Sequence, residues 1–201
     1  VSLPASITIA KLMIPETGPT TEGGMSAPEP AGGAVDAVTR GTIQGVELLA
    51  NIVAMLIVLV ALVYLANALL GLLPEVLGKP VSLQRVMGAV MAPVCWLMGV
   101  PWAEATAAGA LMGTKTVLNE LIAYVDMSRL APGTLSPRSL LIMTYALCGF
   151  ANPGSLGIMI GGMGTMAPGR RADIVRLGMR SLVSGTLTTC LIAAVVGVIT
   201  D

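Results

Sequence analysis

Two clusters of polar residues lie in parts of the sequence that are otherwise apolar. Lys115, Asn119 and Glu120 form the first cluster, and Asn152 and Ser155 form the second. A carboxylate inside a membrane is costly unless it is paired or hydrated, so we interpret Glu120 as a functional residue. A carboxylate, an amide and a hydroxyl together can hydrogen-bond a solute rich in hydroxyl or amide groups. The alternative is structural: Lys115 and Glu120 neutralise each other, and Asn152 caps a kinked helix.

The composition is that of an integral membrane protein. Hydrophobic residues make up 55% of the 201 residues and charged residues 11%, whereas soluble domains carry about 25% charged residues. The 11 basic and 11 acidic residues balance and histidine is absent, so we expect no nucleic-acid partner. The three cysteines lie singly in apolar segments, which indicates packing residues and no metal site in this fragment.

The first 80 residues predict the end of one transmembrane helix and one full span. Residues 1–34 contain that helix end and a cytoplasmic loop. Residues 35–80 begin with an amphipathic interfacial helix, Val35–Glu47, and continue into the uncharged scaffold span Leu48–Pro74. Because the sequence starts at Val1 within a predicted helix, we expect the chain to be the C-terminal portion of a longer protein.

Residues 81–201 predict the elements that position the polar clusters. Residues 81–127 contain short helices and a polar tip at Thr114–Glu120, and a helix of about ten residues covers only half of a roughly 30 Å hydrocarbon core. We therefore expect a re-entrant helical hairpin. Residues 137–168 predict a broken transmembrane helix, and residues 174–200 predict the last transmembrane helix.

Pro153 predicts the interruption of the broken helix. Proline removes a backbone donor and disfavours helical angles at Asn152, while Gly154 adds backbone freedom. Backbone groups freed at membrane depth need partners inside the protein or beside a polar cavity. We therefore expect the segment Phe150–Ser155 to border a ligand site near the hairpin tip.

The distribution of arginines sets the expected orientation. The predicted loop from Arg170 to Arg180 holds four arginines, which places it in the cytoplasm. The C-terminus at Asp201 and the loop Ser128–Arg138 are then external, and the hairpin enters the membrane from outside.

Several segments resemble the concentrative nucleoside transporter family of bacterial type. Gly113–Glu120 with Ala123 and Tyr124, and Ala146–Asn152 with Ser155–Ile158, are similar to the two signature stretches of that family. Further similarity lies in Pro4–Ser6 with Lys11 and Pro15–Thr17, in Gly99–Trp102 and in Pro168–Arg171. The similarity runs in family order along nearly the whole chain, which covers only the C-terminal half of a typical bacterial member.

The resemblance implies an all-α integral membrane fold, half of an inverted-repeat, elevator-type transporter that forms a homotrimer in the bacterial cytoplasmic (inner) membrane. It implies secondary active nucleoside symport, coupled to Na⁺ or H⁺, with the ion and nucleobase sites in the other half. Pro153 and Gly154 depart from the family pattern, which often has a bulkier apolar residue and a small hydroxyl residue there. Purine or pyrimidine preference stays open.

The resemblance also assigns roles to individual residues. The residues that would bind the nucleoside, through its ribose hydroxyls or by lying close to it, are Glu120, Asn152, Ser155 and Phe150. A carboxylate that accepts from hydroxyl groups forms charge-assisted hydrogen bonds, which are stronger than neutral ones. Asn119 would orient the tip, and Lys115 would act as a counter-ion.

Two rival classes stand beside transport. A non-transporting membrane subunit would use the polar tip and the helix break for packing alone. An intramembrane enzyme is disfavoured because the sequence lacks histidine, paired carboxylates and an activated Ser or Cys, so we expect no enzymatic activity.

Overall fold

The regular elements of the chain are helices. The computed structural model describes residues 2–18, 32–76, 78 and 80–200, and within these ranges the elements are α-helices and one short 3₁₀ helix. The all-α class predicted from the sequence is therefore confirmed for the described residues.

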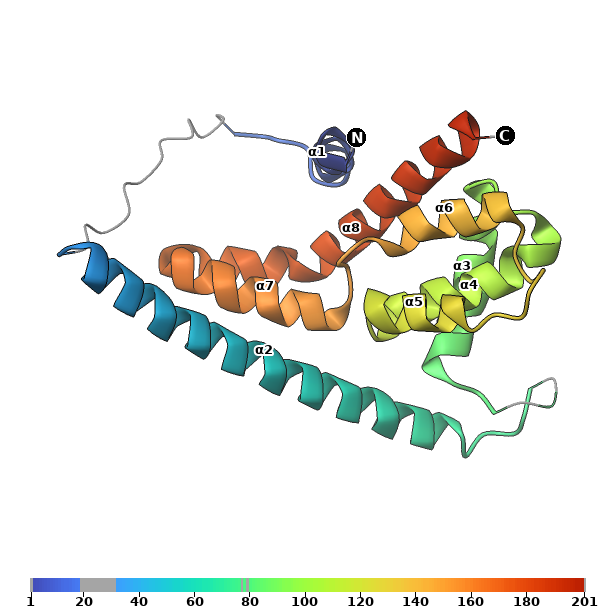
Figure 1. Cartoon of the computed structure of the whole chain (residues 1–201), viewed down its shortest axis with the longest axis horizontal. Helices are drawn as coiled ribbons and strands as arrows, with labels where there is room; N and C mark the ends of the chain where they lie inside the picture. The colour runs from blue at the N-terminus through green and yellow to red at the C-terminus, as the bar shows by residue number, and fades with distance from the viewer. Residues whose placement is uncertain (1, 19–31, 77, 79, 201) are drawn as a thin grey trace.

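Helix α2 is the longest element and lies along one edge of the molecule (Figure 1). It runs from Ala34 to Leu70 as one continuous helix of 37 residues, which corresponds to about 55 Å at 1.5 Å per residue. The interfacial helix predicted at Val35–Glu47 is thus not a separate element, because no proline or paired glycines separate it from the following span. Many large apolar side chains of α2 are exposed, as expected of a helix that faces lipid or further protein.

Helix α1 packs against helix α8 at the other side of the molecule. Helix α1 spans Ser2–Met13 and α8 spans Arg171–Ile199, and the two are in contact (Figure 1). Among the described residues, α8 is the one helix whose length and apolar composition both suffice to cross a membrane. It corresponds to the last transmembrane helix predicted at 174–200.

Helices α3 and α4 form a close antiparallel pair. Helix α3 spans Leu83–Leu97, α4 spans Trp102–Val117, and a four-residue connection joins them. A Cβ atom added at Gly109 would lie 2.5 Å from the carbonyl oxygen of Gly88, and one at Gly113 would lie 2.5 Å from that of Gln84. Only glycine fits at both positions, so the two backbones touch along a small-residue face.

The polar tip is shorter than the sequence predicted. Helix α4 continues through Lys115 to Val117, and helix α5 begins at Glu120 and ends at Ser128. Only Leu118 and Asn119 separate the two helices.

The chain is interrupted again between helices α6 and α7. Helix α6 spans Pro137–Leu147 and helix α7 spans Pro153–Met166. The non-helical residues are Cys148 to Asn152, and Pro153 occupies the first helical position of α7, where its missing N–H costs no hydrogen bond. The principal core lies where α6 meets α4 and α8, with buried side chains that include Met112, Ile142, Met143, Leu147 and Ala193.

The predicted loop from Arg170 to Arg180 is mostly helical, so that expectation is corrected. Pro168–Arg170 forms the 3₁₀ helix η1, and α8 begins at Arg171. Asp173 pairs with Arg170 at 3.0 Å and with Arg176 at 3.1 Å. A carboxylate in the first turn and these pairs stabilise the helical start.

Gly162 and Gly164 of α7 make no close backbone contact with another helix among the described residues. A Cβ atom at Gly162 would meet nothing within 4 Å, and one at Gly164 would meet only the Arg171 side chain, at 3.6 Å. Within the part of the chain that the structure describes, the closest approaches of a glycine to another helix backbone lie between α3 and α4.

Candidate functional site

Two helices begin beside Glu120, and an asparagine caps each of them. The side chain of Asn119 accepts a hydrogen bond from the backbone N–H of Ile122 at 2.9 Å, which starts α5. The side chain of Asn152 accepts from the backbone N–H of Ser155 at 2.9 Å, which starts α7. Glu120 occupies the first turn of α5, where the partial positive charge of the helix end favours a carboxylate.

The two predicted polar clusters meet through one hydrogen bond. The Asn152 Nδ2 amide donates to Glu120 Oε2 at 3.3 Å, although the two residues are 32 positions apart. Asn152 is 2% exposed, whereas Glu120 is half-buried. The carboxylate is thus held by the buried amide on one side and reaches the surface of this chain on the other.

Ser155 belongs to the site through the backbone of Asn152. Its hydroxyl accepts from the Asn152 N–H at 3.0 Å and donates to the Asn152 carbonyl at 2.7 Å. Together with the Asn152 side chain it completes a capping box. The first role of the Ser155 hydroxyl in this structure is therefore to fix the conformation of Asn152.

Lys115 forms its hydrogen bonds with partners other than Glu120. Its ammonium group donates to the Ala146 carbonyl at 3.1 Å and to Thr189 Oγ1 at 3.0 Å. No ion pair between Lys115 and Glu120 occurs within the described residues. The expectation that the two neutralise each other directly is therefore not met. Lys115 instead ties α4 to the end of α6 and to α8.

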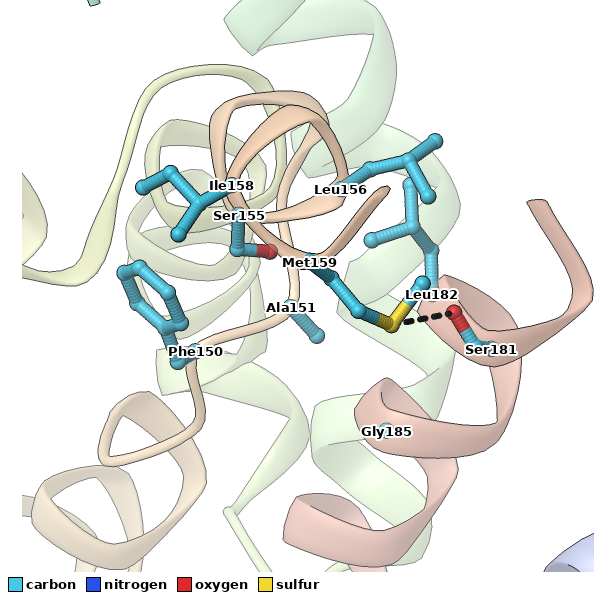
Figure 2. Close-up of a pocket in the computed structure, with 9 residues that line it drawn as sticks. All are labelled: Phe150, Ala151, Ser155, Leu156, Ile158, Met159, Ser181, Leu182 and Gly185. Atoms are coloured by element: carbon cyan, nitrogen blue, oxygen red, sulfur yellow. Dashed lines mark hydrogen bonds between the residues drawn. The ribbon is translucent and has the colours of Figure 1, made fainter. Parts of the chain in front are cut away.

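Phe150 lines a separate apolar pocket between α7 and α8. The pocket has a volume of about 290 Å³, and Phe150, Ser155, Met159 and Ser181 lie in its wall (Figure 2). Figure 2 shows Phe150 beside Ser155 and Ile158, across the pocket from Ser181. Phe150 itself is 59% exposed. Its ring therefore lies next to the capped start of α7, within reach of a molecule bound near Asn152.

The sequence reasoning missed Thr189 and the role of Arg138. Thr189 is a polar residue within an apolar span, and this is the one signal that pointed to it. Arg138 donates to the carbonyl oxygens of Gly99 at 2.8 Å and of Thr200 at 3.1 Å, and also to that of Gly197. It thereby joins the start of α6, the connection between α3 and α4, and the end of α8.

Known proteins are similar to this chain in both sequence and fold. The family model described as "Na+ dependent nucleoside transporter C-terminus" matches residues 1–197. The uncharacterized transporter YutK of Bacillus subtilis is 41% identical over 199 residues, which cover 96% of this chain and 49% of YutK. Solute carrier family 28 member 3 of Homo sapiens is 35% identical over 219 residues, which cover 100% of this chain and 32% of that protein.

A solved structure of a CNTnw variant in an intermediate 2 state has a TM-score of 0.86 and 36% identity. The match covers 99% of this chain and 49% of that one. The chain thus spans about half the length of YutK and of CNTnw. Because the family model covers nearly all of it and the fold agrees, the chain belongs to the Na⁺-dependent nucleoside transporter family of integral membrane proteins.

Proposed function

We propose that the chain is the ribose-binding half of a nucleoside symporter. The hydrogen bond between Asn152 and Glu120 carries this proposal, because it joins the tip between α4 and α5 to the interruption between α6 and α7. Glu120 is the acceptor for ribose hydroxyls, since a carboxylate can accept from two neighbouring hydroxyl groups at once. The Asn152 amide donates a hydrogen bond to this carboxylate and lies beside it in the site.

The remaining site residues take supporting or neighbouring positions. Ser155 keeps Asn152 in place through the capping box and offers its hydroxyl at the same helix start. Asn119 caps α5 and so fixes the backbone that carries Glu120. Phe150 lies beside this region, where its ring covers one side of the bound nucleoside.

Sodium is the coupling ion that the family description favours. The matching family model is described as Na⁺-dependent. The coupling-ion site and the nucleobase contacts lie in the half of the protein outside this chain. Proton coupling is the alternative, and Glu120 is the candidate proton-linked group within this chain.

The parent protein is a homotrimer in the bacterial cytoplasmic membrane and moves its solute by an elevator motion. Helix α2 belongs to the scaffold, and α3 to α8 belong to the moving part. The end of α8 and the connection between α3 and α4 face outward, and the arginines around η1 face the cytoplasm. Trp96 and Trp102, exposed beside that connection with ring centroids 6.1 Å apart, support its place at a membrane interface.

A non-transporting subunit is the rival reading. It accounts for the capped helix starts and for a carboxylate in the first turn of α5. The comparisons do not favour it, because relatives with this fold are transporters.

Uptake of labelled uridine by the full-length protein in proteoliposomes tests the proposal. Glu120→Gln replaces charge-assisted hydrogen bonds by neutral ones, and we expect uptake at low uridine to fall by about tenfold or more. Asp126→Asn makes the same charge change on the same helix and serves as the matched control. If Glu120→Gln shows unchanged concentrative uptake and apparent affinity, the assignment of Glu120 to the ribose site is refuted.

A further inference from the structure

Lys115 is a fully buried lysine whose hydrogen-bond partners are neutral oxygen atoms. Its side chain is 0% exposed. The two hydrogen bonds of its ammonium group go to the Ala146 carbonyl and to the Thr189 hydroxyl, at 3.1 and 3.0 Å. Neither partner is a carboxylate, and no ion pair of the described residues includes Lys115. Solute binding at Glu120 does not explain why the chain keeps this charge here.

The ammonium group lies at the end of a helix that stops within the molecule. Ala146 is in the last turn of α6, where carbonyl oxygens lack helical partners and carry a partial negative charge. Thr189, on α8, adds a hydroxyl oxygen and donates its own proton to Thr186 O at 2.9 Å. A Cβ atom at Gly149 would lie 3.2 Å from the ammonium nitrogen, so the interrupted segment also closes over it.

These oxygen atoms are the ligands that a monovalent cation prefers in transporters. Interrupted helices of membrane transporters use the carbonyl oxygens of their ends to coordinate Na⁺. The same kind of helix end, joined by one hydroxyl, surrounds the ammonium group here.

We propose that the Lys115 ammonium group is a tethered cation that occupies a monovalent-cation site in this half of the transporter. A covalently attached cation stays in place when a free ion would leave. This proposal rests on the proposed symport function, and it means that the interruption between α6 and α7 contributes no coupling ion. The charge of Lys115 keeps the end of α6 neutralised at every stage of transport.

Removal of the tether converts the site into one that a free cation can fill. In Lys115→Ala of the full-length protein, the oxygen atoms lose their cation and the thermal unfolding temperature in detergent falls. The unfolding temperature of Lys115→Ala is then measured in ethylammonium or sodium chloride and in choline chloride at equal ionic strength. We expect ethylammonium or sodium to raise it above the value in choline by about 2 °C or more beyond the same difference in wild type. Lys115→Met fills the volume without charge and leaves no room, so it is expected to respond as wild type does.

Two results would overturn the proposal for Lys115. If Lys115→Ala is folded and responds to ethylammonium, sodium and choline as wild type does, Lys115 is only a packing and hydrogen-bonding residue. If Lys115→Ala does not fold, Thr189→Val is compared with its neighbour Thr188→Val, which loses the same hydroxyl without touching Lys115. The proposal expects the larger fall in unfolding temperature for Thr189→Val, and equal falls overturn it.

Thermal unfolding requires no transport, so this proposal and the proposed function can fail separately. Cation-dependent stabilisation of Lys115→Ala without uridine uptake by wild type would leave the tethered cation in place and refute symport. Uridine uptake by wild type with no cation effect on Lys115→Ala would do the reverse.

Discussion

The contact between Asn152 and Glu120 can be tested by changing one atom. In Asn152→Asp the side chain keeps an oxygen that accepts from the Ser155 N–H, so the cap of α7 survives. The amide nitrogen, 3.3 Å from Glu120 Oε2, becomes a second oxygen. The variant therefore separates the pairing of the two side chains from the capping of the helix.

Two carboxylates at this separation repel each other strongly. At 3.3 Å and an effective dielectric constant of about 20, the Coulomb energy is about 5 kcal/mol. Placing a proton on an ordinary carboxylate at pH 7 costs about 4 kcal/mol, so the uptake of one shared proton limits the penalty at pH 7 to about 4 kcal/mol. Because water screens the half-buried Glu120, we expect Asn152→Asp to lower the free energy of unfolding by about 2–3 kcal/mol at pH 7.

The pH dependence has a definite sign. The folded variant binds more protons than its unfolded chain, so its free energy of unfolding falls as the pH rises and recovers as the pH is lowered. Thermal unfolding of the full-length protein between about pH 5 and about pH 8 measures this slope, relative to wild type. Uptake of labelled uridine in the same range should recover in parallel on the acidic side.

Two further variants make the result specific. Glu120→Gln with Asn152→Asp exchanges the amide and the carboxylate, which restores one donor and one acceptor and should return most of the lost stability. Asn152→Ser keeps a capping oxygen without adding charge and should show no added pH slope. If Asn152→Asp unfolds like wild type across the whole pH range, the two side chains are not in contact in the folded protein.

Two other predictions follow from close contacts. A Cβ atom at Gly149 would lie 2.2 Å from Thr189 Cγ2, so Gly149→Ala should destabilise the full-length protein by about 1–3 kcal/mol in thermal unfolding. Addition of Thr189→Ser removes that methyl group, keeps the hydroxyl, and should recover most of the loss; no recovery would locate the strain elsewhere. Arg138→Gln loses a cation bonded to three carbonyl oxygens and should cost about 2–4 kcal/mol, with Arg138→Lys intermediate. Equal stability of Arg138→Gln and wild type would show that these bonds contribute nothing.

Local signals in the sequence were sufficient for the helix interruption and for the cap at Asn152, whereas the cap at Asn119 was not predicted. Pro153 determines where α7 begins because proline is tolerated only in the first turn. Asn119 and Asn152 are the side chains best suited to cap the helices that follow them. The chemistry of the candidate site was therefore predictable where it depends on neighbours along the chain.

The partners of Lys115 could not be predicted, because they come from elements that follow it by 31 and 74 residues. The sequence favoured Glu120 as its partner on proximity alone, but α4 continues past Lys115 and ends before Glu120. The three carbonyl acceptors of Arg138 leave no signal in side-chain types for the same reason. The long course of α2 was also missed, since charge near its start resembles an interfacial helix.

The glycine contact between α3 and α4 limits how these two helices can move relative to each other. Helices whose backbones touch at Gly109 and Gly113 cannot slide past each other. A displacement of α4, and of the tip that follows it, would therefore move α3 with it as one rigid unit. Asn67, near the end of α2, ties α2 to the start of α3. Its side-chain oxygen accepts from the Leu83 N–H and its amide nitrogen donates to Gln84 Oε1, at 2.9 Å each. A displacement of α3 and α4 relative to α2 would therefore have to break both of these hydrogen bonds.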